Sequence, residues 1–384
     1  MTTAKSEIRS FRVEIPDESL DDLRDRLNRA RWASDIPGPR AEDYGVSLAW
    51  VRRLTEYWRD GYDWRAAEAR LNSYPQFITE IDGQDIHFLH VKSPEPGAFP
   101  LVLTHGWPGS VFEFLNVIGP LTDPRAHGKD PSTAFDLVIP SLPGFAFSAP
   151  LMDLGWSTRR TAAAWCELMA RLGCERYGAA GNDAGSMISP EMGRLDPDRV
   201  AAVHVTQVFS FPSGDPAEFE GMSAEDGAAL QKLQWFMDHK ISFNQLHSQQ
   251  PQTLAHALAD SPVGLLGWNA QLMTPDAMGD KQLDEDFILT NAALYWLTNT
   301  GGSSIRFYYE DAHRAPQAEP TTVPLGVAGF SGDFSGVRRF AERDHKNLVQ
   351  WNMHPEPGGH YAAHLEPAAL ADDIRDFYRA YRLG

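Results

Sequence analysis

The 384-residue sequence has few cysteines, no long apolar run and no excess of positive charge, and each absence excludes a class of protein. Cys166 and Cys174 are too few for a disulfide framework or a zinc cluster, and they suit a reducing compartment. No stretch approaches the roughly 20 apolar residues that a membrane span needs. The polar segment Met1 to Arg12 lacks the apolar core of a secretion signal. We therefore expect a cytoplasmic protein.

The charge is strongly negative instead. The formal net charge is −18 at pH 7, which would repel a polyanion, so no nucleic-acid partner is expected. Hydrophobic residues make up 42% and charged residues 22% of the chain, which is ordinary for a globular protein. A length of 384 residues fits one large core with an added subdomain. The composition thus predicts a soluble globular protein without a nucleic-acid or membrane partner.

The periodicity of apolar residues divides the chain into four segments. Residues 1–95 begin with amphipathic helical patterns, which precede any strand, and end in a predicted hairpin. In residues 96–208, short apolar runs alternate with helical patterns, as expected for crossover units in a mostly parallel sheet. Residues 209–300 are helical in pattern, and strand patterns return in residues 301–384. This outline predicts an α/β-hydrolase core with a helical lid insertion and a helical N-terminal extension.

The individual elements follow from the same patterns. Strands are expected at residues 77–81, 86–90, 101–104, 135–140, 177–180, 200–205, 322–328 and 348–351. Helices are expected around residues 20–27, 48–62, 158–172 and 367–381.

The segment Gly181-Asn182-Asp183-Ala184-Gly185, between a predicted strand and a predicted helix, has the spacing of a nucleophile elbow. Small residues flank the central one in such an elbow because the sharp, strained turn leaves no room for bulk. A carboxylate at the centre forms an ester with an electrophilic sp³ carbon rather than with an acyl group. Taken alone, the segment fits an ordinary turn at least as well, so other features have to decide.

Two further loops supply such features. His105 to Ser110 follows a predicted strand where α/β-hydrolases place one backbone oxyanion donor, which gives the N–H groups of Trp107 and Ala184 as candidates. His360 follows the last predicted strand, and Asp333 is the only carboxylate close behind the strand before it. Nucleophile, acid and histidine then occur in the chain order of this fold. An ordinary Gly-Pro turn does not explain the His105-Gly106-Trp107-Pro108 combination at this place, so a functional role is favoured.

Together these motifs resemble the microsomal-type epoxide hydrolases of the α/β-hydrolase superfamily, over nearly the whole chain and including that family's N-terminal extension. The matching pieces are Phe11 to Pro16, Leu20 to Trp32, His105 to Ser110, the elbow at Asp183, Asp260 to Gly264, Ser303 to Tyr308, and Gly358 to Ala363. The resemblance implies a hydrolase that converts an epoxide to a vicinal diol through an ester on Asp183. It further implies that His360, oriented by Asp333, activates water, and that Tyr308 hydrogen-bonds the epoxide oxygen.

The sequence departs from the family pattern at two places. The family usually has a second lid tyrosine where this chain has Phe243, which carries no hydroxyl. Ring opening then depends on Tyr308 alone, or on Tyr309 or Tyr295 from another direction. The family also commonly has Trp after the nucleophile, whereas this chain has Ala184. Alanine keeps the backbone N–H, so we expect an intact oxyanion hole and a wider pocket.

Five residues are expected to line the substrate pocket, namely His105, Pro108, Phe243, Trp235 and Trp268. Their aromatic character suggests a bulky apolar or aromatic epoxide, although packing within the lid explains the lid aromatics equally well. No metal and no organic cofactor is required by this chemistry. The expected partner is the small-molecule epoxide, and the sequence is also compatible with a homodimer. Roles in detoxification and in secondary metabolism fit equally.

Two other functions share these motifs. Haloalkane dehalogenases use the same aspartyl ester, but their halide site resembles a pair of N–H donors that includes a Trp after the nucleophile, and Ala184 has no indole. A non-catalytic α/β-hydrolase that binds a small molecule or a protein is the alternative from another class. It does not explain why Asp183, Asp333 and His360 are all present. We therefore expect an epoxide hydrolase.

Overall fold

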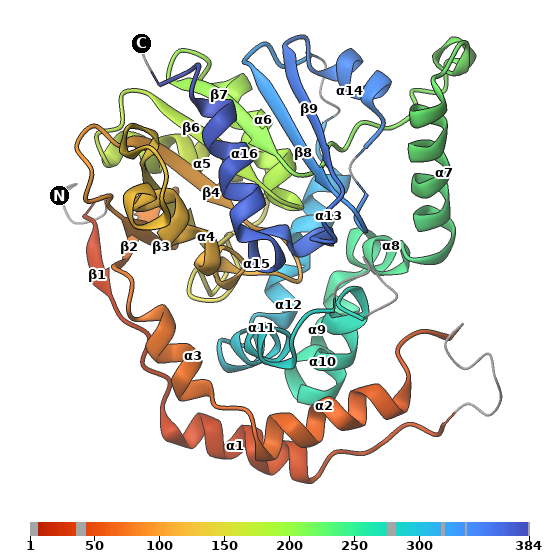
Figure 1. Ribbon diagram of the computed structural model, residues 1–384. Coiled ribbons are helices and arrows are strands. Elements are labelled where there is room, and N and C mark those ends of the chain that lie inside the picture. The colour runs from red at the N-terminus through yellow and green to blue at the C-terminus, as the bar shows by residue number, and fades with distance from the viewer. Residues whose placement is uncertain (1–6, 36–43, 275–281, 316–318, 335, 383–384) are drawn as a thin grey trace.

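A single mixed sheet of nine strands runs through the computed structural model (Figure 1). The structure describes residues 7–35, 44–274, 282–315, 319–334 and 336–382; the first six residues of the polar N-terminal segment lie outside these ranges. The strands are β1 (Arg9–Phe11), β2 (Gln76–Ile81), β3 (Gln84–Val91), β4 (Phe99–Thr104), β5 (Phe135–Pro140), β6 (Tyr177–Gly181), β7 (Val200–Val205), β8 (Leu325–Phe330) and β9 (Leu348–His354).

The strand order is β1-β2-β3-β5-β4-β6-β7-β8-β9. Pairing is antiparallel from β1 through β3 to β5, and parallel from β5 to β9. The parallel strands β4 to β8 are largely buried on both faces and are rich in Val, Leu, Ala and Gly, which explains why their sequences are short continuous apolar runs rather than alternating ones; β9, at the edge of the sheet, is more exposed. The predicted mostly parallel sheet is confirmed.

One prediction about the N-terminal region was wrong. The helical segments there do not precede every strand, because β1 comes before them and pairs with β2, so that Phe11 lies opposite Gln76. Three residues are too few to show an alternating pattern, and the partner strand lies more than sixty residues further along the chain. Local periodicity therefore carries no signal for β1.

Helices cover both faces of the sheet. The core helices are α4 (Leu115–Thr122), α5 (Thr158–Arg171), α6 (Ala184–Leu195), α14 (Arg338–Asp344), α15 (Ala362–Leu365) and α16 (Pro367–Tyr378). Helices α5 and α6 pack together on one face, and α4 and α16 pack together on the other (Figure 1). Short 3₁₀ helices occur at Val111–Phe114, Pro124–His127, Pro131–Thr133, Pro216–Phe219, Ala270–Leu272 and Gly359–Tyr361. None of the helices in the described ranges has the length and apolar character that crossing a membrane would require.

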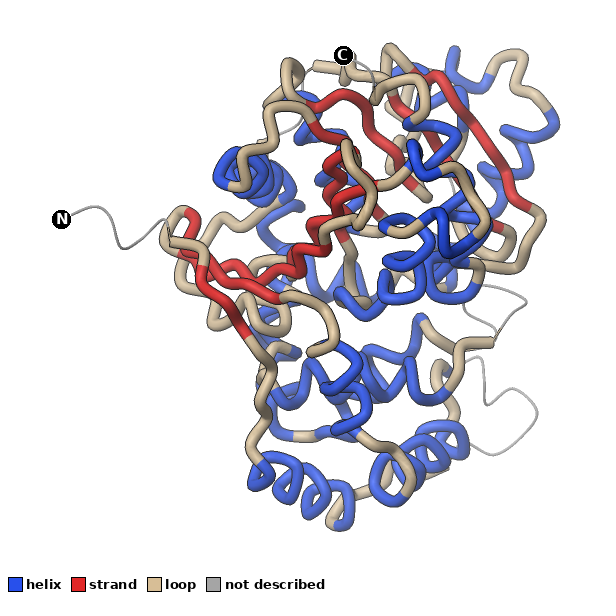
Figure 2. Tube along the Cα trace, turned by 60° about the vertical axis from the view of Figure 1, so that its left-hand side comes forward, coloured by secondary structure: helices blue, strands red, loops and turns tan. Residues whose placement is uncertain are grey.

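A second, helical layer lies beside the sheet (Figure 2). It contains α7 (Ala224–His239), α8 (Ser242–Gln249), α9 (Pro251–Asp260), α10 (Pro262–Asn269), α11 (Glu285–Leu297), α12 (Gly301–Ser304) and α13 (Arg306–Ala312). The N-terminal helices are α1 (Asp17–Asn28), α2 (Leu48–Asp60) and α3 (Trp64–Leu71). They pack against α10 and α11 on the side away from the sheet (Figure 1).

Hydrogen bonds join these two helical groups. The hydroxyl of Tyr57 donates to Asp286 over 2.7 Å, and the hydroxyls of Tyr62 and Thr290 lie 2.9 Å apart. Arg26 donates to the carbonyl oxygen of Asp260 over 2.9 Å. The N-terminal helices therefore brace the helical insertion from outside.

Candidate active site

Asp183 occupies the sharp turn between β6 and α6. Its backbone is in the left-handed region, with φ 52° and ψ −120°, which is strained for a residue with a side chain. The turn holds the carboxylate at the carboxyl edge of the sheet, where it lines a cavity. The strain is tolerated because neighbouring groups fix the turn on all sides.

The glycines of the elbow have a direct steric cause. A Cβ on Gly181 would overlap the backbone of Gly185, and a Cβ on Gly185 would overlap the carbonyl oxygen of Thr104 at the end of β4. A Cβ on Gly106 would likewise overlap the carboxylate of Asp183. The Gly-x-Asp-x-Gly spacing is therefore required by close packing of β6, α6 and the loop after β4.

Two backbone N–H groups point at the Asp183 carboxylate. The N–H of Trp107 donates to Oδ1 over 2.9 Å, and the N–H of Ala184 also donates to the carboxylate. These are the two groups that the sequence singles out as oxyanion donors. Burial raises the pKa of Asp183 above its ordinary value, against the opposing effects of His360 and of these two N–H groups. The backbone donors thus favour the charged form, as expected, without fully offsetting burial.

His360 and Asp333 lie beside the nucleophile. Nδ1 of His360 is 3.2 Å from Oδ2 of Asp333, and its Nε2 is 3.9 Å from Oδ2 of Asp183. His360 lies in the turn after β9, and Asp333 lies just after β8. Burial lowers the pKa of His360, but the carboxylates of Asp333, Asp183 and Glu113 outweigh this effect and raise the pKa to about 9.

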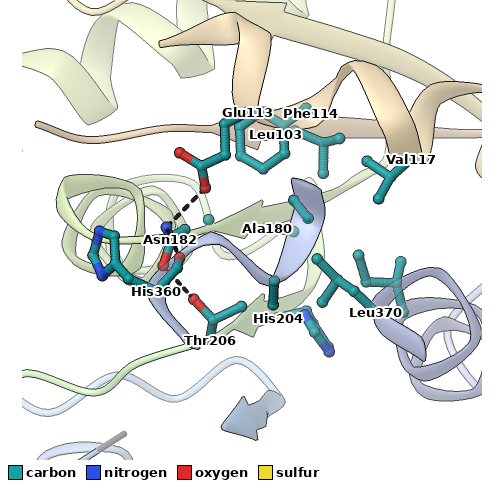
Figure 3. Close-up of a pocket in the computed structure, with 14 residues that line it drawn as sticks. Leu103, Glu113, Phe114, Val117, Ala180, Asn182, His204, Thr206, His360 and Leu370 are labelled. Atoms are coloured by element: carbon teal, nitrogen blue, oxygen red, sulfur yellow. Dashed lines mark hydrogen bonds between the residues drawn. The ribbon is translucent and has the colours of Figure 1, made fainter. Parts of the chain in front are cut away.

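Glu113 is a buried acid that the sequence did not single out. Its Oε1 accepts a 2.7 Å hydrogen bond from Nδ2 of Asn182, which also donates to the carbonyl oxygen of His360 over 2.8 Å (Figure 3). Thr206 donates to the other end of the Asn182 amide over 2.6 Å (Figure 3). Burial raises the pKa of Glu113 to about 8, so that the carboxyl is largely neutral at pH 7.

This network borders a small cavity of about 20 Å³ (Figure 3). The cavity is lined mainly by apolar side chains of β4, β6, α4 and α16, with Glu113 and His360 at one end. It is far too small for an organic substrate, so the substrate cavity has to be the larger one that Asp183 lines.

The larger cavity has a volume of about 250 Å³ and lies between the carboxyl edge of the sheet and the helical insertion. Asp183, Asp333, His360 and Tyr308 all line it, so the structure brings together the four predicted catalytic side chains. The rest of the wall is mainly apolar and comprises Ala184, Met187, Phe209, Phe211, Leu233, Phe236, Met237, Ile241, Phe243, Leu272, Phe307 and Phe334, with Gln207, Asn244, Ser248, Asp311 and Ala312.

Tyr308 is the one tyrosine among the described residues that line this cavity. Its ring lies edge-on to Trp107 and to Phe243, with centroids 6.1 and 5.9 Å away. Tyr295 is not available from another direction, because its hydroxyl donates to the carbonyl oxygen of Gly109 over 2.8 Å. Tyr309 also fails as a substitute, since it is 38% exposed and does not line the cavity.

Of the five predicted pocket residues, the structure places only Phe243 in the cavity wall. His105 is fully buried, and its Nε2 accepts a hydrogen bond from the N–H of Leu142, so its role is to hold a loop. Pro108 is buried in the same loop as His105 but does not line the cavity.

The two predicted pocket tryptophans also lie elsewhere. Trp235 is 46% exposed and stacks on His239, one turn further along α7. Trp268 donates its indole N–H to Nε2 of His247 over 2.9 Å, behind the cavity wall. Aromatic composition predicted an apolar lid but could not show which faces of the lid helices point inward, since that depends on the packing of α7, α8 and α10.

The sequence missed several cavity residues, of which Gln207 and Asp311 are the most polar. Gln207 lies two residues beyond β7, at the same sheet edge as Asp183, so its place after a predicted parallel strand was a usable signal. Asp311 follows Tyr308 by three positions on α13, which puts both on one face of that helix. In the described part of the chain, no group of three or more His, Cys, Asp and Glu side chains could hold a metal ion.

Known proteins share the sequence and the fold of this chain. Residues 8–114 match the family model of the epoxide hydrolase N terminus, and residues 100–300 match that of the alpha/beta hydrolase fold. The chain is 41% identical over 382 residues to the "Putative epoxide hydrolase" of Stigmatella aurantiaca, which covers 98% of this chain and 86% of that protein. The chain belongs to the epoxide hydrolase family.

Other members of the family are similar over almost their full length. Epoxide hydrolase 1 of Oryctolagus cuniculus is 32% identical over 404 residues, with 96% of this chain and 88% of that protein covered. The solved structure of Aspergillus niger epoxide hydrolase has a TM-score of 0.86 and 32% identity, covering 99% of this chain and 98% of that one. The predicted family, the α/β-hydrolase fold and the assignment as a hydrolase of epoxides are confirmed.

Proposed function

We propose that Asp183 is the nucleophile of a two-step epoxide hydrolysis. In the first step its carboxylate oxygen attacks one ring carbon, the C–O bond of the ring breaks, and an ester with a neighbouring alkoxide forms. Tyr308 donates its proton to that alkoxide. A phenol hydrogen-bonds weakly to an intact epoxide and strongly to the more basic alkoxide, so its contribution grows toward the transition state.

In the second step water attacks the ester carbonyl of Asp183, and His360 accepts the proton of that water. The N–H groups of Trp107 and Ala184 then stabilise the oxyanion, a contribution for which loss of one donor typically costs about 3–4 kcal/mol. Collapse of the tetrahedral intermediate breaks the bond to the alkyl oxygen, which takes the proton held by His360 and leaves as the second hydroxyl of a vicinal diol. The remaining proton of the attacking water, released from the Asp183 carboxyl, returns to Tyr308. Asp333 stabilises the imidazolium that forms when His360 accepts the first proton of the attacking water.

The electrostatics of the site support this order of steps. In the free enzyme the charge of Asp183 is one of the causes that raise the pKa of His360. Ester formation removes that charge, so the pKa of His360 falls from about 9 once the first step is complete. Because a base has to be neutral before it can accept a proton, alkylation itself prepares His360 for the second step.

We further propose a bulky, largely apolar epoxide as substrate. The cavity wall is mainly aromatic and aliphatic, and its volume of about 250 Å³ suits a ring-bearing molecule. A small aliphatic epoxide would fill little of it. We expect styrene oxide to be hydrolysed with a higher kcat/KM than propylene oxide, and equal values would contradict the proposed substrate class.

The observation that carries the mechanism is the position of Asp183, which accepts hydrogen bonds from two backbone N–H groups and faces both His360 and Tyr308 across one cavity. Single-turnover incubation with styrene oxide, acid quenching and peptide mass analysis test it directly. We expect one styrene oxide added to the Asp183 peptide, followed by release of the diol.

The same experiment separates the alternatives. Diol without any ester would exclude the covalent route. Neither ester nor diol across a broad epoxide panel would favour a binding protein without catalysis. Halide release from a chloroalkane or bromoalkane without diol formation would indicate a dehalogenase.

Several expectations of cellular and molecular organisation stay proposals. We retain the division into segments 1–95, 96–208, 209–300 and 301–384, a cytoplasmic location and the absence of a nucleic-acid partner, which the net charge of −18 supports. A homodimer is compatible with the sequence, and sedimentation analysis of the purified protein would decide it.

A further inference from the structure

Gln207 connects the nucleophile to the triad acid. It follows β7, which lies between β6 and β8 in the sheet, so it stands between Asp183 after β6 and Asp333 after β8. Its Oε1 accepts the backbone N–H of Asp183 over 2.9 Å, and its Nε2 donates to Oδ2 of Asp333 over 2.7 Å. The side chain is 97% buried, since only 3% of its surface is exposed, and it lines the substrate cavity.

The orientation of this amide is chemically fixed. A backbone N–H can only donate, so the amide oxygen has to face Asp183. The amide nitrogen then has to face Asp333, whose carboxylate can only accept. The opposite orientation would set two donors against each other at Asp183 and two acceptors against each other at Asp333.

This fixed orientation affects His360. The Gln207 nitrogen lies 3.2 Å from Nδ1 of His360, and Nδ1 lies 3.2 Å from the same Asp333 oxygen that Gln207 reaches at 2.7 Å. When Nδ1 carries a proton, both groups are donors and share one acceptor. The hydrogen bond from Gln207 thus takes up part of the negative charge that would otherwise support protonated His360.

We propose that Gln207 is a positioning residue, which holds the Asp183 elbow and the Asp333 carboxylate at a fixed separation and limits how strongly Asp333 stabilises protonated His360. This rests on the proposed two-step mechanism and adds a residue to it. The consequence concerns the second step, in which His360 has to be neutral before water attacks. Without the amide, Asp333 would hold the proton on His360 more firmly.

The other charged groups that face His360 do not replace this effect. Asp183 and Glu113 are the carboxyls that raise its pKa besides Asp333. Asp183 loses its charge in the ester, and Glu113, whose pKa burial raises to about 8, is largely neutral at pH 7 and hydrogen-bonds to Asn182 rather than to the His360 ring. In the ester, therefore, the interaction of Asp333 with its two donors mainly sets the basicity of His360.

Two substitutions of Gln207 distinguish the contributions of its two hydrogen bonds, because one changes a single bond and the other removes both. Gln207→Glu keeps an acceptor for the Asp183 N–H but sets a carboxylate oxygen against Asp333. Gln207→Met has a similar volume and removes both hydrogen bonds. Gln234→Met is the matched control, because Gln234 is exposed on α7 and its amide donates to Asp238 on the same helix.

The measurement is the pH dependence of ester hydrolysis after one turnover with styrene oxide, with ester formation timed separately by quenched mass analysis. We expect both variants to shift the acidic limb of the pH–rate profile of ester hydrolysis to higher pH by about half a pH unit or more, with the larger shift in Gln207→Glu. Ester formation is expected to fall more in Gln207→Met than in Gln207→Glu, because only the former leaves the Asp183 N–H without its partner.

If Gln207 merely filled space, its substitution would lower stability or both rates without shifting the pH of the acidic limb. Unchanged limbs in both variants, with hydrolysis within about twofold of wild type, would overturn the proposal. If Gln207→Met does not fold, which a thermal melt would show, the limb of Gln207→Glu decides alone. Absence of ester and diol in the wild-type enzyme would instead refute the proposed mechanism, so the two failures are distinguishable.

Discussion

The two walls of the substrate cavity are built in different ways. On the sheet side, Asp183, Asp333 and His360 follow three different strands. His360 is hydrogen-bonded to Asp333, Gln207 links Asp333 to the backbone N–H of Asp183, and the Asp183 carboxylate accepts from the backbone N–H of Trp107. On the lid side, Tyr308 stands in a cluster of rings that includes Phe243 and His247. Among the described residues, no hydrogen bond to the Tyr308 hydroxyl holds it in place.

The difference between the two walls reflects what the nucleophile and base on one side, and the acid on the other, each require. The nucleophile and base need fixed positions, and a polar network attached to parallel strands provides them at the cost of burying several charges. The acid needs an apolar surrounding, in which a phenol keeps its proton until an alkoxide forms. Burial raises the pKa of Tyr308 well above its ordinary value, consistent with that task. Several hydrogen bonds therefore hold the catalytic groups on the sheet side, whereas the lid side depends on the hydroxyl of Tyr308.

Among substitutions on the sheet side, removal of the nucleophile is expected to reduce activity most. Asp183→Ala is expected to abolish ester formation and to lower kcat by about six orders of magnitude, because loss of a nucleophile disables both steps. Mass analysis of the Asp183 peptide and diol assays measure the effect. Asp153→Ala, at an exposed carboxylate, serves as control. Substantial diol formation by Asp183→Ala would contradict the assignment.

Removal of the base should affect only the second step. His360→Gln is expected to form the ester and then to hydrolyse it about 10⁴-fold more slowly, so that the ester accumulates. In the wild-type enzyme, hydrolysis should fall as the pH drops through the pKa of His360 in the ester, which lies below about 9. Quenched-flow mass analysis measures both effects. An ester that fails to accumulate in the variant would exclude His360 as the base.

Loss of the single lid hydroxyl tests the other wall. Tyr308→Phe is expected to slow ester formation by about 100-fold or more, since general acid catalysis typically contributes that much. Tyr309→Phe, the neighbouring tyrosine outside the cavity, is expected to change the rate less than about twofold. Similar losses in both variants would show that the hydroxyl of Tyr308 has no special role.

A second hydroxyl on the lid side would make that wall less dependent on Tyr308. Phe243 lines the cavity, stacks on Trp107 at 5.4 Å and lies next to Tyr308. Phe243→Tyr is expected to raise the rate of ester formation by about tenfold, the effect of one added hydrogen bond to a developing charge. It should also restore part of the activity of Tyr308→Phe in the double variant. A gain in neither background would show that this position cannot reach the epoxide oxygen.

The smallest expected effect concerns the buried carboxyl of Glu113. Because burial raises the pKa of Glu113 to about 8, its contribution to folding is full below the ordinary pKa of a carboxyl and is lost as the pH rises toward 8. Glu113→Gln cannot ionise and can still accept the hydrogen bond from Asn182. We expect the Tm of the variant relative to wild type to increase between about pH 5 and about pH 8. A difference that stays constant over this range would mean that Glu113 does not titrate there.

The sequence predicted the sheet side of the site much better than the lid side. Asp183 and Asp333 follow buried parallel strands, which are recognisable as short apolar runs that end at one edge of the sheet, and His360 follows the more exposed edge strand β9. The close packing that requires Gly181 and Gly185 leaves a visible spacing in the sequence. Position after a strand therefore located these three side chains, and the family resemblance implied that Asp333 orients His360, whereas the hydrogen bonds through Gln207 were not predicted.

The lid side could not be predicted in the same way. Trp235 and Trp268 were expected in the pocket, but one is exposed and the other is bonded to His247. Which face of a lid helix points inward depends on contacts with distant segments, and an aromatic side chain packs equally well on either face. Glu113 was missed because an acid in a helical stretch normally lies at the surface, and only the folded structure shows that it is buried.

The brace formed by α1 to α3 has a consequence for the order in which the enzyme becomes active as it folds. The hydrogen bond from Arg26 to Asp260 joins residues 234 positions apart, and the pair Tyr62 and Thr290 spans 228 positions. Contacts of such long sequence separation tend to form late, after neighbouring strands have paired. We expect a sheet with its nucleophile already in place to precede a closed cavity. Substrate affinity would then be the last property that a refolding molecule regains, and a bound ligand would speed its final consolidation.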